Sequence, residues 1–152
     1  MTEADRFNET RRWLQYAEED LLAAEAALGR EDTFPRHVCW LAQQSAEKAL
    51  KAVLVFLQVD FPRSHDLDAL RNLIPDGWRL KVDHPDLASL TEWVVEARYP
   101  GDWPDAVEAD ARSAARQARA IWESVCAGLA QHGLDADMLS DEDVHQARRN
   151  TC

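Results

Sequence analysis

The sequence has few residues that can cross-link a fold or interrupt its helices. It contains three cysteines, five glycines and six prolines among 152 residues. The cysteines, Cys39, Cys126 and Cys152, are odd in number and form no C-x-x-C pair. Neither a disulfide framework nor a zinc knuckle is therefore indicated. We expect a reducing, cytoplasmic environment.

Long apolar runs and an excess of positive charge are also missing. No segment approaches the roughly 18 consecutive apolar residues of a membrane span, and the start, MTEADRFNET, has no apolar run. The formal net charge of −11 repels nucleic acid unless basic residues gather locally. These absences predict a soluble protein with no membrane partner and no broad affinity for nucleic acid.

What is present is a helical pattern, in which apolar residues recur at steps of three and four without strand alternation or internal repeats. Helices are expected over about 4–28, 36–59, 67–74 and 86–99, followed by a last long helix from Trp103–Pro104 to about 129. Ser64 or Asp66 would cap the short helix, and 75–85 would form a loop. This pattern predicts an all-α, antiparallel four/five-helix up-and-down bundle. We expect the bundle to span 1–133 and a peripheral acidic tail to follow over 134–152.

The helix expected at 36–59 is the most apolar, yet its stretch AQQSAEKALK carries two amides and three charges. On a helical projection one arc holds Gln43, Gln44, Glu47, Lys48 and Lys51, together with Trp40, Leu54 and Val55. One interpretation is a solvated face, where pairs four residues apart add a few tenths of a kcal/mol each. The other is a face that meets a second surface, because interfaces mix large apolar side chains with amides and charges.

Three motifs occur in order along the chain: AQQSAEKALKAVL at 42–54, SHDL at 64–67 and ARYP at 97–100. With these three motifs, the chain resembles the HEPN domain family (higher eukaryotes and prokaryotes nucleotide-binding) over about residues 10–128. The resemblance implies a helical bundle that usually dimerises and often acts beside a minimal nucleotidyltransferase in a toxin–antitoxin-type pair. It also implies a nucleotide as the ligand to consider, with no resident cofactor.

We therefore expect a non-catalytic accessory or binding protein that forms a homodimer and acts with a minimal nucleotidyltransferase. The candidate nucleotide- or partner-binding residues are Gln43, Gln44, Glu47, Lys48, His65, Arg98 and Tyr99. His65 also has a structural interpretation, because a neutral imidazole beside a helix cap can lock the turn. Arg98 would end a helix, where a cation is favoured, and its guanidinium would fork well onto phosphate or carboxylate.

An enzyme is the alternative class. Many HEPN toxins cleave RNA with an Arg-x4–6-His motif on the last long helices, but no histidine occurs between Arg98 and Trp122. The spacing does occur in Arg79-LKVD-His84 and Arg30-EDTFPR-His37, which we interpret as loop coincidences because Pro85 follows the first and helix geometry is not expected there. No catalytic residue is assigned, and a metal-independent, toxin-type endoribonuclease stays the alternative.

Basic residues also line the last helix, at Arg112, Arg116 and Arg119. Glu108 and Glu123 lie four residues from two of them, which favours a solvated ladder of ion pairs over a track for a phosphate backbone. Carboxylates and histidines elsewhere show no recognised metal spacing, so we expect no bound metal.

Overall fold

A computed structural model describes residues 1–96 and 105–134 of the chain. Its helices are α1 (Glu3–Ala27), α2 (Pro35–Leu57), α3 (Leu67–Asn72), α4 (Arg79–Asp83), α5 (Ala88–Glu96) and α6 (Glu108–Gln131). The described residues contain no strand. The predicted all-α bundle is confirmed.

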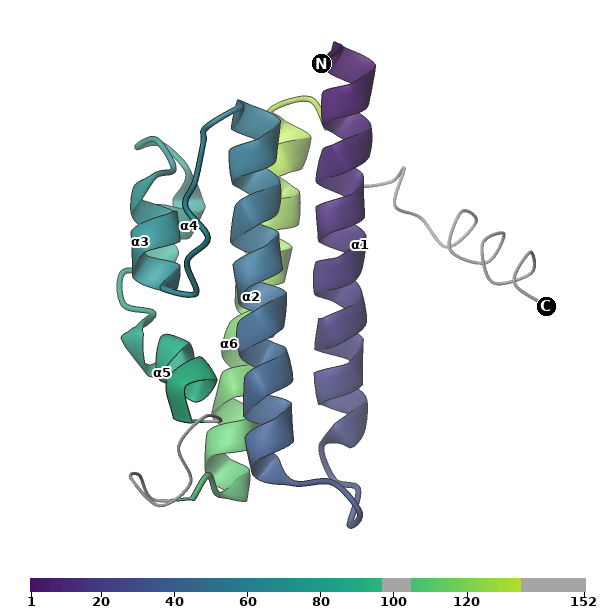
Figure 1. The fold of residues 1–152 in the computed structure, drawn as a ribbon, viewed down its shortest axis with the longest axis vertical. Coiled ribbons are helices and arrows are strands. Elements are labelled where there is room, and N and C mark those ends of the chain that lie inside the picture. Colours follow the sequence, from purple (N-terminus) through teal and green to yellow (C-terminus); the bar gives the residue numbers. More distant parts are fainter. Residues whose placement is uncertain (97–104, 135–152) are drawn as a thin grey trace, which may run out of the picture.

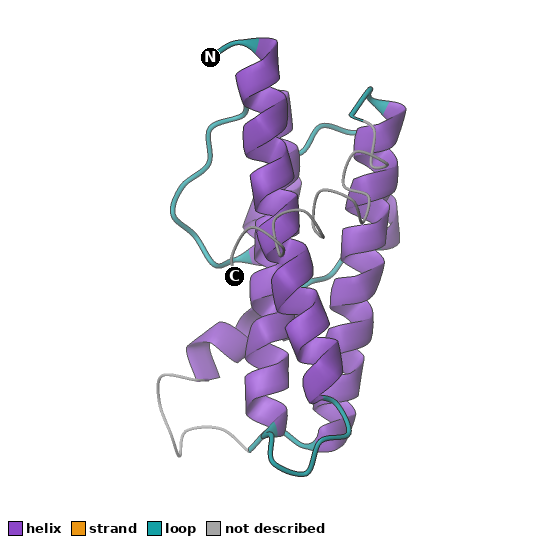
Figure 2. Ribbon diagram, turned by 90° about the vertical axis from the view of Figure 1, so that its right-hand side faces the viewer, coloured by secondary structure: helices purple, strands orange, loops and turns teal. Residues whose placement is uncertain are grey.

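Helix α2 is the centre of the bundle, flanked by α1 on one side and by α3 and α5 on the other, with α6 behind it (Figure 1). The long helices run along a common axis in both views (Figures 1 and 2). α1 and α2 are antiparallel, whereas α2 and α6 run in the same direction because α3, α4 and α5 lie on the path back to the start of α6. Each long element therefore buries one side against α2.

Local chemistry explains where the helices begin and end. The Thr2 hydroxyl accepts from the backbone N–H of Asp5, whose carboxylate accepts from the backbone N–H of Thr2, which caps α1. α2 starts with Pro35 and stops where Gln58 adopts a left-handed conformation at φ 57°. Asp66, one of the two predicted caps, accepts from the backbone N–H of Ala69 at the start of α3.

Small residues let α1 and α2 pack closely. The alanines of this seam have no exposed surface: Ala17, Ala24, Ala42, Ala46 and Ala49. Ser45 is equally buried, and its hydroxyl donates to the carbonyl of Ala17 at 2.7 Å. A buried hydroxyl thus finds a partner on the facing helix, as it must to avoid a desolvation cost.

The prediction of a loop over 75–85 is wrong, because α4 forms inside it. Trp78 and Leu80 are buried and hold this segment against α6. A helix of five residues shows too little periodicity to be recognised, and no side-chain cap marks its start.

The last helix also begins later than predicted, at Glu108 instead of Trp103–Pro104. Its start is set by Asp110, whose carboxylate accepts from the backbone N–H of Val107 at 2.9 Å. Arg98, Tyr99 and residues 135–152 of the predicted tail lie outside the described residues. No helix in the described ranges is both long and apolar enough to cross a membrane.

Candidate functional site

A group of polar side chains lies on α2 beneath the segment 58–66, which connects α2 to α3. We call this group the polar cluster; it consists of Gln43, Glu47, Lys51 and His65. Gln43, Glu47 and Lys51 recur at every fourth position, so they form one stripe along the helix. Each of the three is at most 9% exposed. The stripe is therefore internal.

Glu47 is the centre of the polar cluster. Its Oε1 accepts from His65 Nδ1 at 2.7 Å and from Gln43 Nε2 at 3.4 Å, and its Oε2 accepts from Lys51 Nζ at 3.3 Å. A buried carboxylate is tolerated only when it is paired and hydrogen-bonded. Three donors from two elements meet that requirement.

His65 is held at two points. Its ring binds Glu47, and its backbone carbonyl accepts from Gln43 Nε2 at 3.1 Å. An ionised carboxylate accepts hydrogen bonds and cannot donate them, so the Nδ1 atom of His65 carries the proton of this contact. The other ring nitrogen, Nε2, takes no part in it. The side chain remains 51% exposed. The imidazole is thus both fixed and accessible.

Lys51 completes the inner side of the polar cluster. Its Nζ lies 5.9 Å from the ring centre of Trp13 on α1 and 5.7 Å from that of Phe61 in the 58–66 segment. The two rings contact each other edge to face at 6.4 Å. Cation–π contacts of this kind stabilise a partly desolvated ammonium. The segment 58–66 is therefore fastened to both long helices.

An accessible strip runs beside the polar cluster on α2; we define it as Trp40, Gln44 and Lys48. Gln44 Nε2 donates to Gln43 Oε1 at 2.7 Å, which connects the strip to the cluster. Lys48 Nζ pairs with Asp20 of α1 at 2.5 Å, and Trp40 keeps 38% of its surface exposed. The strip offers an indole, an amide and a cation on one side of the bundle.

These contacts settle where the sequence-predicted residues lie. Gln43, Gln44, Glu47 and His65 are joined by hydrogen bonds, whereas Lys48 turns toward α1. The interpretation of one solvated face is wrong for Gln43, Glu47 and Lys51, because the 58–66 segment covers them. The predicted pair between Glu47 and Lys51 does form.

A second candidate site is a groove of about 560 Å³ between α4 and α6. Its polar lining residues are Arg79, Asp83, His84, Glu123, Ser124, Gln131 and His132. The expectation that Arg79-LKVD-His84 lies in a loop is wrong, because Arg79 to Asp83 is helical. Arg79 and His84 also border one groove. The short side chains of α6 on this side, such as Ala120 and Ala127, leave the space open.

The groove holds its two histidines differently. Burial lowers the pKa of His84 below its ordinary value, against an opposing effect of Asp83, so this imidazole is neutral at neutral pH. The ring of His132 stacks on Trp78 with 4.2 Å between ring centres, and its Nδ1 lies 2.8 Å from the carbonyl of Gly128. Gly128 leaves room for Trp78, since a Cβ there would lie 2.7 Å from the indole.

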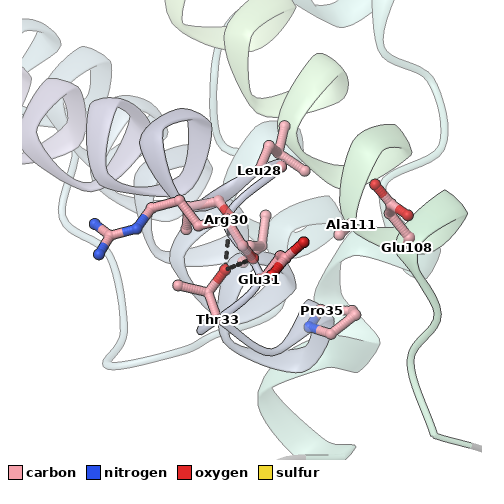
Figure 3. A pocket seen from close by; sticks show the side chains of 10 residues that line it. Leu28, Arg30, Glu31, Thr33, Pro35, Glu108 and Ala111 are labelled. Carbon is pink, nitrogen blue, oxygen red and sulfur yellow. Dashed lines mark hydrogen bonds between the residues drawn. The ribbon is translucent and has the colours of Figure 1, made fainter.

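The other histidine spacing in the sequence does not build a site. Arg30 borders a small pocket of about 230 Å³ between the loop after α1 and the start of α6, with Glu31 and Glu108 on its walls (Figure 3). The Arg30 guanidinium points away from this pocket and pairs with Asp32 at 3.1 Å. His37 is not among the residues that line it.

The predicted ion-pair ladder of the last helix forms in part. Arg112 pairs with Glu108 at 2.7 Å, as the spacing indicates. Arg119 instead makes two hydrogen bonds to Glu25 on α1, and this contact raises the pKa of the guanidinium. The bidentate geometry of arginine and carboxylate explains the preference for the partner on the other helix.

Sequence patterns alone did not reveal the contacts of Trp13 and Phe61 with Lys51, or the groove beside α4. A lysine inside an apolar helix is a signal for an aromatic or acidic partner, but it does not say which residue supplies it. In the described part of the chain, no group of three or more histidine, cysteine, aspartate or glutamate side chains has the arrangement of a metal site.

The structure defines a small helical-bundle protein in which two sequence motifs, AQQSAEKALKAVL and SHDL, meet in one polar cluster. The profile of the HEPN domain matches residues 10–129, and the chain belongs to this family.

A relative comes from Methanocaldococcus jannaschii and is named "Putative toxin MJ1304". The two chains are 36% identical over 95 residues, which cover 58% of this chain and 61% of the relative. The chain thus spans less than two thirds of that protein's length. No solved structure matches the chain.

Proposed function

We propose that this chain is the HEPN subunit of a toxin–antitoxin-type pair and that it acts by binding, with a minimal nucleotidyltransferase as its partner. The observation that carries the proposal is the surface formed by His65 and the accessible strip. Gln44, Lys48 and His65 are fixed by contacts inside the bundle, and the side chains of His65 and Trp40 reach solvent. Preorganised groups lose little entropy on binding, which favours recognition.

Two further observations support this proposal. The first is the similarity to a relative whose name describes a toxin, over a stretch of 95 residues. The second is the mixture of an exposed indole, an amide and a cation in the accessible strip, since tryptophan is enriched among the residues that dominate interface energies. We expect the partner to cover Trp40 and to contact Lys48 and His65.

Affinity measurement between this chain and a purified minimal nucleotidyltransferase tests the proposal. Trp40→Ala and Lys48→Glu should each weaken the complex at least about tenfold, as expected when a contact worth about 1.4 kcal/mol is lost. Val82→Ser is the matched control, because Val82 is 78% exposed on α4, away from the strip. No complex with the wild-type chain, or equal weakening by the control, would contradict the proposal.

A second candidate function is metal-independent RNA cleavage, and the groove between α4 and α6 is the observation that favours it. Arg79 and His84 both border this groove, and the neutral His84 can accept a proton. An exposed arginine beside it can stabilise charge on a phosphorane.

Cleavage of RNA by the purified protein in the presence of a chelator tests this second function. His84→Ala should abolish the activity, whereas His37→Ala should leave it unchanged because His37 lies on α2 outside the groove. Activity that survives His84→Ala would locate the chemistry elsewhere or in a contaminant.

A further inference from the structure

The groove between α4 and α6 has the size of a ligand site and one wall without long side chains. Its volume of about 560 Å³ lies within the usual range of small-molecule pockets, about 300–1,000 Å³. α6 contributes Ala120, Ala127 and Gly128 to the lining, and none of these side chains is longer than a methyl group. Methyl groups attract an alkyl chain and offer no hydrogen bond to a polar one. This wall therefore favours a ligand with an aliphatic middle.

Two carboxylates border the same groove from different helices. Asp83 lies at the end of α4, and Glu123 lies on α6. In the described part of the chain, Glu123 makes no ion pair and no hydrogen bond. Arg119, which precedes it by four residues, instead makes two hydrogen bonds to Glu25 on α1. Glu123 therefore presents an unpaired negative charge to the groove.

The second carboxylate is only weakly engaged. Arg79 Nε lies 3.6 Å from Asp83 Oδ2, and the Arg79 side chain is 83% exposed. Because exposed ion pairs contribute little to stability, a ligand cation can take the place of this guanidinium at small cost. Asp83 is thus available to a ligand as well.

The net charge of the groove favours a cation. With neutral histidines, its lining holds two carboxylates and one guanidinium, which gives a net charge of −1. Burial lowers the pKa of His84, so this imidazole adds no positive charge at neutral pH. The formal charge of −11 on the whole chain acts in the same direction. An anion is therefore disfavoured as the occupant.

We propose that this groove binds a small linear diamine, whose two ammonium groups pair with Asp83 and Glu123 and whose alkyl chain lies along the alanine-lined wall of α6. Two charges at the ends of a chain match two carboxylates on different helices, whereas a monoamine can pair with only one of them. The accessible strip contributes no residue to the groove, so the inference goes beyond the proposed function and does not depend on it.

Calorimetric titration of the full chain tests this inference with three probes of similar length: 1,4-diaminobutane, 1-aminobutane and butane-1,4-diol. The ionic strength is kept low, because salt screens exposed ion pairs. The diamine should bind saturably and at least about tenfold more tightly than the monoamine. The diol should give no saturable heat.

Substitutions of the two carboxylates locate the site. Asp83→Asn and Glu123→Gln should each weaken diamine binding at least about tenfold, towards the affinity of the monoamine. Glu19→Gln is the matched control, because it removes the same charge from an exposed position on α1 outside the groove. Ala127→Leu should abolish binding by filling the groove with no change of charge. Ala127 is exposed, so this variant should keep the melting temperature of the wild type.

Arg79→Ala separates a diamine site from an RNA site in the same groove. Removal of the guanidinium frees Asp83, so the diamine should bind more tightly to this variant than to the wild type. A site for RNA would lose affinity, because the cation that attracts phosphate is gone. Weaker diamine binding by Arg79→Ala would overturn the inference.

Three other results would also overturn it: no saturable heat with the diamine, equal affinities for diamine and monoamine, or equal losses in Glu19→Gln and Glu123→Gln. The last two are the results expected of unspecific attraction to the net charge of −11. None of them affects the nucleotidyltransferase complex, which Trp40→Ala and Lys48→Glu test at a different surface.

Discussion

Glu47 and His65 lie 18 residues apart in the sequence, and their side chains meet at 2.7 Å. This contact joins the middle of α2 to the segment that leads into α3. It also explains why the buried side of α2 carries a carboxylate and a lysine four residues apart. The charges belong to an internal network that holds a surface histidine.

Removal of Glu47 should destabilise the protein strongly. Glu47→Ala leaves the ammonium of Lys51 nearly buried without its carboxylate, and breaking such a pair typically costs about 3–5 kcal/mol. The free energy of unfolding in urea measures the effect. Glu108→Ala is the control, because it breaks an exposed pair with Arg112 and should cost less than about 1 kcal/mol. Similar costs for the two variants would show that the buried network contributes little.

Gly128→Ala should destabilise the bundle although alanine favours helices. An added Cβ would lie 2.7 Å from two ring atoms of the buried Trp78, and overpacking of this kind costs about 1–3 kcal/mol. Helix propensity alone predicts a gain of about 1 kcal/mol. In a Trp78→Ala background the same substitution should become neutral or stabilising, which a double-mutant cycle of melting temperatures measures. A loss of the same size in both backgrounds would contradict the steric explanation.

His84 should make stability depend on pH. Its pKa in the folded protein lies below the ordinary value of 6.5, so the unfolded chain binds a proton more readily. Stability is therefore complete above pH 6.5 and falls as the pH drops through 6.5 toward the lowered pKa of the folded state. The difference in unfolding free energy between wild type and His84→Gln, measured on both sides of that pH, isolates the contribution. An unfolding free energy that falls equally below pH 6.5 in wild type and in His84→Gln would contradict this prediction.

Cys126 should resist thiol reagents in the native protein. Burial, with a smaller effect of Glu18 and Glu123, raises the pKa of its thiol to about 12, and only the thiolate is reactive. Cys39 is also fully buried. In a Cys152→Ser variant, labelling by a maleimide should therefore be slow until denaturant is added. Fast labelling of Cys126 under native conditions, located by peptide mass spectrometry to distinguish it from Cys39, would contradict this prediction.

The long helices were predictable because their apolar residues repeat over many turns, and the burial of Leu14, Leu21, Ile121 and Leu129 agrees with that pattern. α4 was not predictable, since five residues held by Trp78 and Leu80 depend on contacts with α6 and not on local periodicity. Tertiary packing decided the structure of this segment.

The candidate site was predictable in its residues and not in its geometry. The resemblance to the HEPN family pointed to Gln43, Glu47 and His65, which the structure joins. Helical projection alone assigned Gln43, Glu47 and Lys51 to an outer arc, because it cannot show that a loop crosses that arc. The roles predicted for Arg98 and Tyr99 stay predictions.

The contacts of the 58–66 segment also couple the surface of the bundle to its interior. His65 contacts Glu47, Glu47 pairs with Lys51, and the ammonium of Lys51 lies against the rings of Trp13 and Phe61. A displacement of the His65 ring would therefore be passed to Trp13 on α1 through only two side chains, Glu47 and Lys51. The 58–66 segment thus connects the surface to the core. A partner that moves His65 on binding would change the surroundings of the Trp13 indole, and the fluorescence of that indole would report the binding.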